Sequence, residues 1–168
     1  MIVLGLGRAA DLHSTYAASP RLLLESNQWM RKVGWRNTLL INVAFVLAVP
    51  LVFGRSGTVM IAAFSSLLAY RNYTLVPLCR AIGEEGYLKA ITQYHRSSSA
   101  RAYSCVVLVK LAIFVSLGIA IIGIVAVDHS SRMWFVADVG RAFVFYGFFI
   151  ATFEMFARLQ SRAASPGH

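Results

Sequence analysis

The sequence has little charge, and very little of that charge is acidic. Only 14% of its 168 residues are charged, 16 of them Lys or Arg and 7 Asp or Glu, while 58% are hydrophobic. Charged residues average about 25% in soluble domains, so this composition does not fit an ordinary soluble protein. We assign the net charge of +9 to cytoplasmic loops that meet lipid headgroups. We therefore expect membrane lipids as partners and no nucleic acid.

Residues typical of catalytic and metal sites are also scarce. The two cysteines, Cys79 and Cys105, form no C-x-x-C pair, and we expect both to be reduced. Of four histidines only His13 lies where it could reach membrane depth, so a haem held by two histidines is not expected. Serine-hydrolase, zinc-protease and P-loop motifs are absent. We predict no catalytic residue, no metal and no cofactor beyond contact with a lipid, a quinone or a pigment.

Long apolar runs are present instead. They cover residues 37–53, 57–78, 103–127 and 133–157, and a membrane-spanning helix needs about 20 mostly apolar residues. Short joins leave no room for a second domain. We predict a single integral membrane domain over residues 1–168, an all-α polytopic transmembrane bundle of four long spans plus a short N-terminal helix.

The N-terminal stretch, residues 1–18, carries polar groups at helical spacing. Asp11, Ser14 and Thr15 fall on one helical face, which we expect to be covered by protein within or against the bilayer. Glu25 and Asn27 follow a Ser-Pro break. These oxygen-bearing side chains could bind a hard cation or hydrogen-bond the loop in place, and the lack of a second carboxylate-rich segment favours the loop role.

This pattern, Asp11-x-x-Ser14-Thr15 followed by Glu25-x-Asn27, resembles the opening of an uncharacterised family of small bacterial multi-span membrane proteins. Gln28 stands where that family has proline. The resemblance covers the N-terminal part of the chain, implies a multi-span bacterial membrane protein, and implies no activity.

The basic residues indicate the orientation. One side of the membrane has only Arg55 and Arg132, and the N-terminus is outside if the chain has five spans and inside if it has four. The other side collects eleven bases: Arg21, Arg31, Lys32, Arg36, Arg71, Arg80, Lys89, Arg96, Arg101, Arg158 and Arg162. Because basic loops stay in the cytoplasm, we predict a cytoplasmic C-terminus in a bacterial inner membrane. Residues 84–95 of the main polar connection are spaced as a surface helix.

Ionisable residues inside the apolar runs are candidates for function, because charge in lipid is costly. Asp138 and Arg141 stand three apart and are expected to pair, or to form a site for a polar ligand, a proton or a partner helix. Lys110 is placed to reach the cytoplasmic surface with its long side chain. Glu154 and Arg158 are spaced to form an i, i+4 ion pair.

Packing features outnumber chemical ones. Ala112, Ser116 and Ala120 form a stripe of small residues that permits close approach of another helix. The last run holds more aromatic rings than a small bundle can bury. Four of them are expected to touch another subunit or a lipid-like molecule: Phe145, Phe148, Phe149 and Phe153.

These features favour a non-catalytic accessory or structural subunit of a larger bacterial membrane complex, with energy-converting complexes among the candidate hosts and other membrane subunits as partners. A small transporter or channel is the first alternative, with a polar pathway through Asp11 and the Asp138–Arg141 pair. A lipid-acting membrane enzyme is the second, with Asp11, His13 and Glu25 as its acid–base set.

Overall fold

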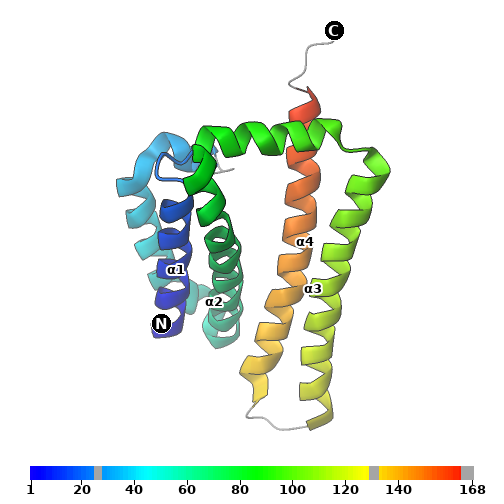
Figure 1. Ribbon diagram of the computed structural model, residues 1–168. Coiled ribbons are helices and arrows are strands. Elements are labelled where there is room, and N and C mark those ends of the chain that lie inside the picture. Colours follow the sequence, from blue (N-terminus) through cyan, green and yellow to red (C-terminus); the bar gives the residue numbers. More distant parts are fainter. Residues whose placement is uncertain (25–27, 129–132, 164–168) are drawn as a thin grey trace.

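A computed structural model of the chain describes residues 1–24, 28–128 and 133–163, with only the backbone at 28–31, 128 and 163. Its elements are all helices: α1 (Ile2–Ala18), α2 (Gln28–Ser97), α3 (Ala100–Asp128) and α4 (Trp134–Ala163) (Figure 1). The prediction of an all-helical chain is confirmed. Glu25 and Asn27 lie outside the described residues.

Helix α2 is continuous in sequence but changes direction at three glycines. Gly34, Gly54 and Gly83 have φ of 73°, 62° and 73°, in the left-handed region that glycine adopts without a steric penalty. They divide α2 into a first arm (residues 35–53), a second arm (residues 55–82) and a surface segment (residues 84–97). In Figure 1 the two arms run in opposite directions, and the surface segment crosses the upper end of the molecule.

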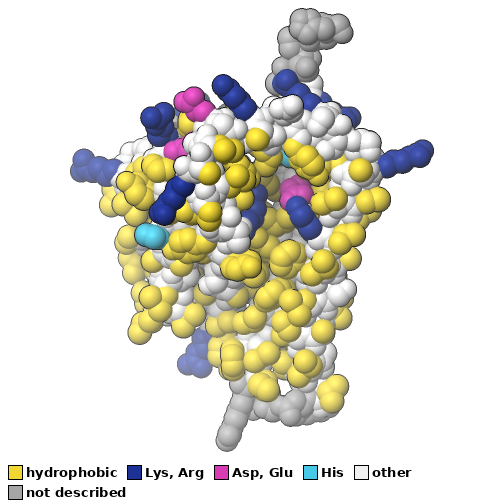
Figure 2. Space-filling view, in the orientation of Figure 1, with side chains coloured by type: hydrophobic (Ala, Val, Ile, Leu, Met, Phe, Trp, Pro, Cys, Tyr) yellow, Lys and Arg dark blue, Asp and Glu magenta, His cyan; other side chains and the backbone are white. Residues whose placement is uncertain are grey.

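Three helices, α2, α3 and α4, are long and apolar enough to cross a membrane by length and composition. Two of the predicted runs are the two arms of α2, because Gly54 turns the chain between them. Figure 2 shows the lower part of the molecule covered mainly by hydrophobic side chains, with most Lys and Arg side chains toward the upper end. This distribution is typical of a membrane protein.

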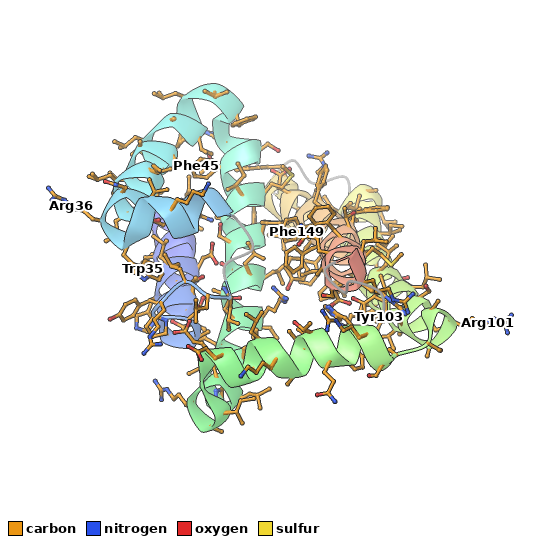
Figure 3. The ribbon with its side chains drawn as sticks, turned by 90° about the horizontal axis from the view of Figure 1, so that it is seen from above. Trp35, Arg36, Phe45, Arg101, Tyr103 and Phe149 are labelled. Carbon is orange, nitrogen blue, oxygen red and sulfur yellow. The ribbon has the colours of Figure 1, made fainter. Side chains whose placement is uncertain are left out.

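The helices group into two halves. The N-terminal half consists of α1 and the two arms, and the C-terminal half is the α3–α4 hairpin (Figure 3). In the N-terminal half α1 lies so close to the second arm that a Cβ on Gly7 would be 2.8 Å from the carbonyl oxygen of Ala62. Leu4, Val49 and Ala62 form the apolar core there.

The C-terminal half is packed through glycines. A Cβ on Gly118 would lie 2.6 Å from the Gly140 carbonyl oxygen, and a Cβ on Gly140 would lie 2.9 Å from that of Gly118. Farther along α4, a Cβ on Gly147 would lie 3.0 Å from the Cβ of Phe114. The two backbones therefore touch. The predicted stripe, Ala112, Ser116 and Ala120, takes no part in this contact, since all three residues are exposed.

Candidate functional site

The polar face of α1 meets both arms of α2 through Arg8. Its Nη1 is 2.8 Å from Asp11 Oδ2 and 3.4 Å from Ser65 Oγ, and its Nε donates to Asn42 Oδ1 at 3.0 Å. A second Arg8 nitrogen, Nη2, contacts the same Asn42 oxygen, and the guanidinium lies over the Phe45 ring. One cation thus ties α1 to the first arm and to the second arm.

This network is buried, as the sequence pattern requires. Asp11 is 8% exposed, Ser14 is completely buried and Ser65 is 1% exposed. Thr15 accepts a hydrogen bond of 3.0 Å from the Asn72 side chain. The predicted face of α1 is therefore covered by protein. Sequence reasoning did not identify the partners on α2, although polar residues inside apolar runs, such as Asn42, were a usable signal.

His13 is not brought to Asp11. It is exposed and hydrogen-bonds Tyr73 Oη through Nδ1 at 2.7 Å. Residues two apart on a helix do not share a face, so Asp11 is turned inward while His13 is turned outward. The acid–base set of the enzyme alternative does not converge in the part of the chain that the structure describes.

A second network ties the lower end of α4 to the second arm. Asp138 is 1% exposed, its Oδ1 lies 2.7 Å from Arg141 Nη1, and Ser56 Oγ donates to the same oxygen. The pair expected from the spacing is therefore present, and Ser56 is an added partner. Ser56 and Ser65 are nine residues apart on the second arm, which separates the two networks by about 13 Å along its axis. Asp11 and Asp138 belong to separate networks.

The upper end of the C-terminal half contains a third group. Lys110 Nζ lies 2.7 Å from Glu154 Oε1, and Tyr103 Oη donates to the Glu154 backbone oxygen at 2.8 Å. The predicted Glu154–Arg158 pair is wrong. Arg158 instead stacks over the Tyr103 ring at 4.4 Å and donates to the Ser98 carbonyl at 2.8 Å. The α3–α4 hairpin offers each side chain a tertiary partner that its own helix does not.

The surface segment is fastened to α4 near its C-terminal end. His95 is 7% exposed, with Nδ1 3.4 Å from Ser161 Oγ, and Arg96 donates to the Ser161 carbonyl at 3.1 Å. Burial lowers the pKa of His95 from its usual 6.5, Glu154 acts in the opposite direction, and Arg158 lowers the pKa further. The neutral imidazole is therefore the form that the fold favours.

Glu84 fastens the other end of the surface segment to the turn after α1. Its Oε2 accepts from Ser19 Oγ at 2.7 Å, and its two oxygens accept from the backbone N–H groups of Arg21 at 3.0 Å and Leu23 at 3.3 Å. A cavity of about 800 Å³ lies beside it. Sequence reasoning missed this carboxylate, because a Glu at the start of a surface helix resembles an ordinary solvated charge.

The four aromatic residues expected at an interface divide into two pairs. Phe145 and Phe148 are 58% and 54% exposed. Phe149 packs edge-on against Phe64 of the second arm, with ring centroids 5.3 Å apart, and stacks on Phe153 at 6.2 Å. The first pair therefore faces outward, while Phe149 and Phe153 contact the second arm through Phe64 and Arg71, with Phe149 still 44% exposed.

Within the described residues no three His, Cys, Asp or Glu side chains gather as a metal site would require. The two cysteines are unpaired, with Cys79 buried and Cys105 exposed.

Comparison with protein-family models, with curated proteins and with solved structures found no match. The resemblance of the N-terminal pattern to a bacterial membrane family stays a prediction.

Proposed function

We propose that this protein is a five-span, non-catalytic accessory subunit of a larger membrane complex. The proposal rests on the exposed outer side of the C-terminal half. There α3 and α4 carry small and aromatic residues that are typical of helix contacts, and these residues are exposed in the part of the chain that the structure describes. The saturated polar interior and the distribution of basic residues give further support.

The first unused surface is on α3. Successive residues turn by about 100° around a helix, which places Ala112, Ser116 and Ala120 on the side of α3 opposite Gly118, where α4 packs. Among the described residues nothing lies within 4 Å of a Cβ built on Gly123, on the same outer side. Small residues allow helix backbones to approach closely in a membrane. This side of α3 fits a helix of another subunit.

The second unused surface is on α4. Phe145, Phe148 and Phe156 share its outer side by helical spacing and are 58%, 54% and 57% exposed. Aromatic side chains provide large rigid contact areas and are enriched where protein partners bind. This ridge is a second surface on which a membrane subunit can pack.

The interior supports a structural role over a polar pathway. Among the described side chains that are not exposed, no fully buried nitrogen or oxygen lacks a hydrogen-bond partner. Arg8 hydrogen-bonds both Asp11 and Asn42, as expected for groups that hold helices together. A transport pathway needs groups that exchange partners with a moving solute.

The topology we propose has the N-terminus outside and the C-terminus in the cytoplasm of a bacterial inner membrane. The turn after α1, the surface segment and the end of α4 lie at one end of the molecule (Figure 1). Most bases expected on the cytoplasmic side belong to that end, whereas Arg55 belongs to the opposite turn. A reporter fused after Arg162 should be active only in the cytoplasm.

The test is co-purification. A tagged chain extracted with a mild detergent should run with partners, well above its own 18.5 kDa. Ala120→Leu places a large side chain on the outer side of α3 and should release the partner. Ala48→Leu makes the same change at an exposed position of the first arm and should not. A wild-type chain that always purifies alone, or two variants that behave alike, would contradict the subunit proposal.

A further inference from the structure

Charged and aromatic side chains from α2, α3 and α4 come together at the surface segment, between the two halves. They are Arg71 of the second arm, Tyr87 of the surface segment, Lys110 of α3, and Phe153 and Glu154 of α4. Figure 2 shows acidic and basic side chains below this segment, set among hydrophobic ones. We call this group of five residues the crevice.

Arg71 is a half-buried cation without a carboxylate partner among the described residues. Its guanidinium lies over the Phe153 ring, 5.6 Å from the centroid. Arg71 stands twelve residues before Gly83, about 18 Å along the second arm from the surface segment. A cation at that position among apolar helices calls for a counter-charge.

The neighbouring charges do not supply one. Glu154 is engaged by Lys110 at 2.7 Å, so these two neutralise each other. Arg158 adds a further positive charge above them, held by a ring and a carbonyl oxygen. The group of charges under the surface segment is therefore net positive, and its natural occupant is an anion.

The surroundings fit an anion with an apolar tail. Tyr87 of the surface segment is half-buried and close enough to feel these charges: burial raises its pKa, Arg71 lowers it, and Cys79 and Glu154 raise it. Just below, Phe149 and Phe153 stack on each other and Phe64 meets Phe149 edge-on. A polar end with donors therefore sits directly above an aromatic wall.

We propose that the crevice binds one anionic phospholipid, with its phosphate on the Arg71 guanidinium and the Tyr87 hydroxyl and an acyl chain against Phe149 and Phe153. Guanidinium binds phosphate oxygens through paired N–H donors. A free inorganic anion would use the donors but not the wall. The proposal is independent of whether the chain has a protein partner.

The first experiment measures lipid retention by native mass spectrometry after exchange from mixed micelles. The wild type should keep one phosphatidylglycerol in preference to phosphatidylcholine. Arg71→Gln should bind phosphatidylglycerol about tenfold more weakly, since a charge-assisted hydrogen bond is lost. Arg101→Gln removes the same charge from an exposed side chain that points away from the molecule (Figure 3) and should leave retention unchanged. Equal retention by the two variants would overturn the proposal.

A second measurement uses the wild type alone and stands even if Arg71→Gln does not fold. Phosphatidylglycerol with a photoreactive acyl chain should cross-link to α4 near Phe149 and Phe153. Labelling spread evenly over the outer helix surfaces would contradict the site. Inorganic phosphate should neither raise the thermal midpoint nor displace the lipid. If phosphate alone did both, the crevice would be a site for a free anion and the lipid assignment would be wrong.

Discussion

The helices inside the N-terminal half and the helices inside the C-terminal half are held together by different interactions. In the N-terminal half one guanidinium, that of Arg8, bonds to side chains of both arms. In the C-terminal half the closest approach is between two backbones, at Gly118 and Gly140, and the Lys110–Glu154 ion pair lies at the far end of the hairpin. A charged network fixes which groups must meet, whereas a glycine contact fixes only how close two helices come. α1 therefore turns its polar face toward α2, while apolar side chains on its other side, such as Ile2 and Leu6, stay exposed.

The largest expected effect is on the polar half. Arg8→Met removes the cation from a buried pair and leaves the Asp11 carboxylate and the Asn42 oxygen without it. Breaking a buried pair at one end typically costs about 3–5 kcal/mol. We expect a clear loss of folded protein in a thermal or denaturant assay in detergent. Arg36→Met, at an exposed position of the first arm, should change stability little. Equal losses for both variants would show that Arg8 is not the link between α1 and the arms.

A smaller effect is expected in the glycine half. Gly118→Ala would place a Cβ 2.6 Å from a backbone oxygen, so the helices must separate, at a cost of about 1–3 kcal/mol for overpacking. Gly123→Ala, on the open side of the same helix, is the matched control and should not destabilise the protein. The measurement is the thermal midpoint of each variant. If Gly123→Ala were the more damaging change, the bare side of α3 would be occupied in the protein as purified.

The Asp138 network joins the two halves and should be weaker than its burial suggests. Arg141 is 55% exposed at the side chain, so it can turn to solvent or headgroups when its partner is changed. Asp138→Asn keeps an acceptor for Ser56 and should cost about 1 kcal/mol. Adding Arg141→Gln should change the result by less than about 0.5 kcal/mol, as for an exposed pair. Strong rescue by the second substitution would mean that Arg141 is buried in the assembled protein.

The smallest effect concerns pH. The pKa of His95 is lower in the packed surface segment than its ordinary value of 6.5. As the pH falls, the His95 imidazole therefore takes up a proton more readily when the segment has detached from α4 than when it is packed. Attachment of the surface segment to α4 should therefore weaken as pH falls from about 8 to 5. Hydrogen exchange of residues 84–97 measures this. The dependence should disappear in His95→Gln, and its persistence there would show that His95 is not the titrating group.

Local features of this chain could be predicted and tertiary ones could not. The helices and the Asp138–Arg141 pair follow from apolar runs and three-residue spacing, which need no knowledge of neighbours. Glu154 shows the limit. Its i, i+4 partner Arg158 was expected, yet Lys110 on α3 binds it, because only the hairpin decides which side chains face each other.

Glycine positions were the other limit. Ala112, Ser116 and Ala120 form the more regular stripe, but Gly118 and Gly140 make the contact, since two facing glycines allow a closer approach than alanine does. The crevice could not be predicted either, because its residues come from three helices that only the folded chain brings together.

The Arg8 network also sets an order of events during synthesis. Its partners Asn42 and Ser65 lie 34 and 57 residues after Arg8, and Glu84 lies 65 residues after Ser19. When α1 leaves the ribosome, none of these groups has yet emerged to meet it. A short helix that carries an arginine and an aspartate is costly to place in lipid without partners. We therefore expect α1 to remain at the membrane surface until the second arm is complete. The first helix made would then be among the last to settle, and a chain stopped after the first arm should leave its N-terminus on the cytoplasmic side.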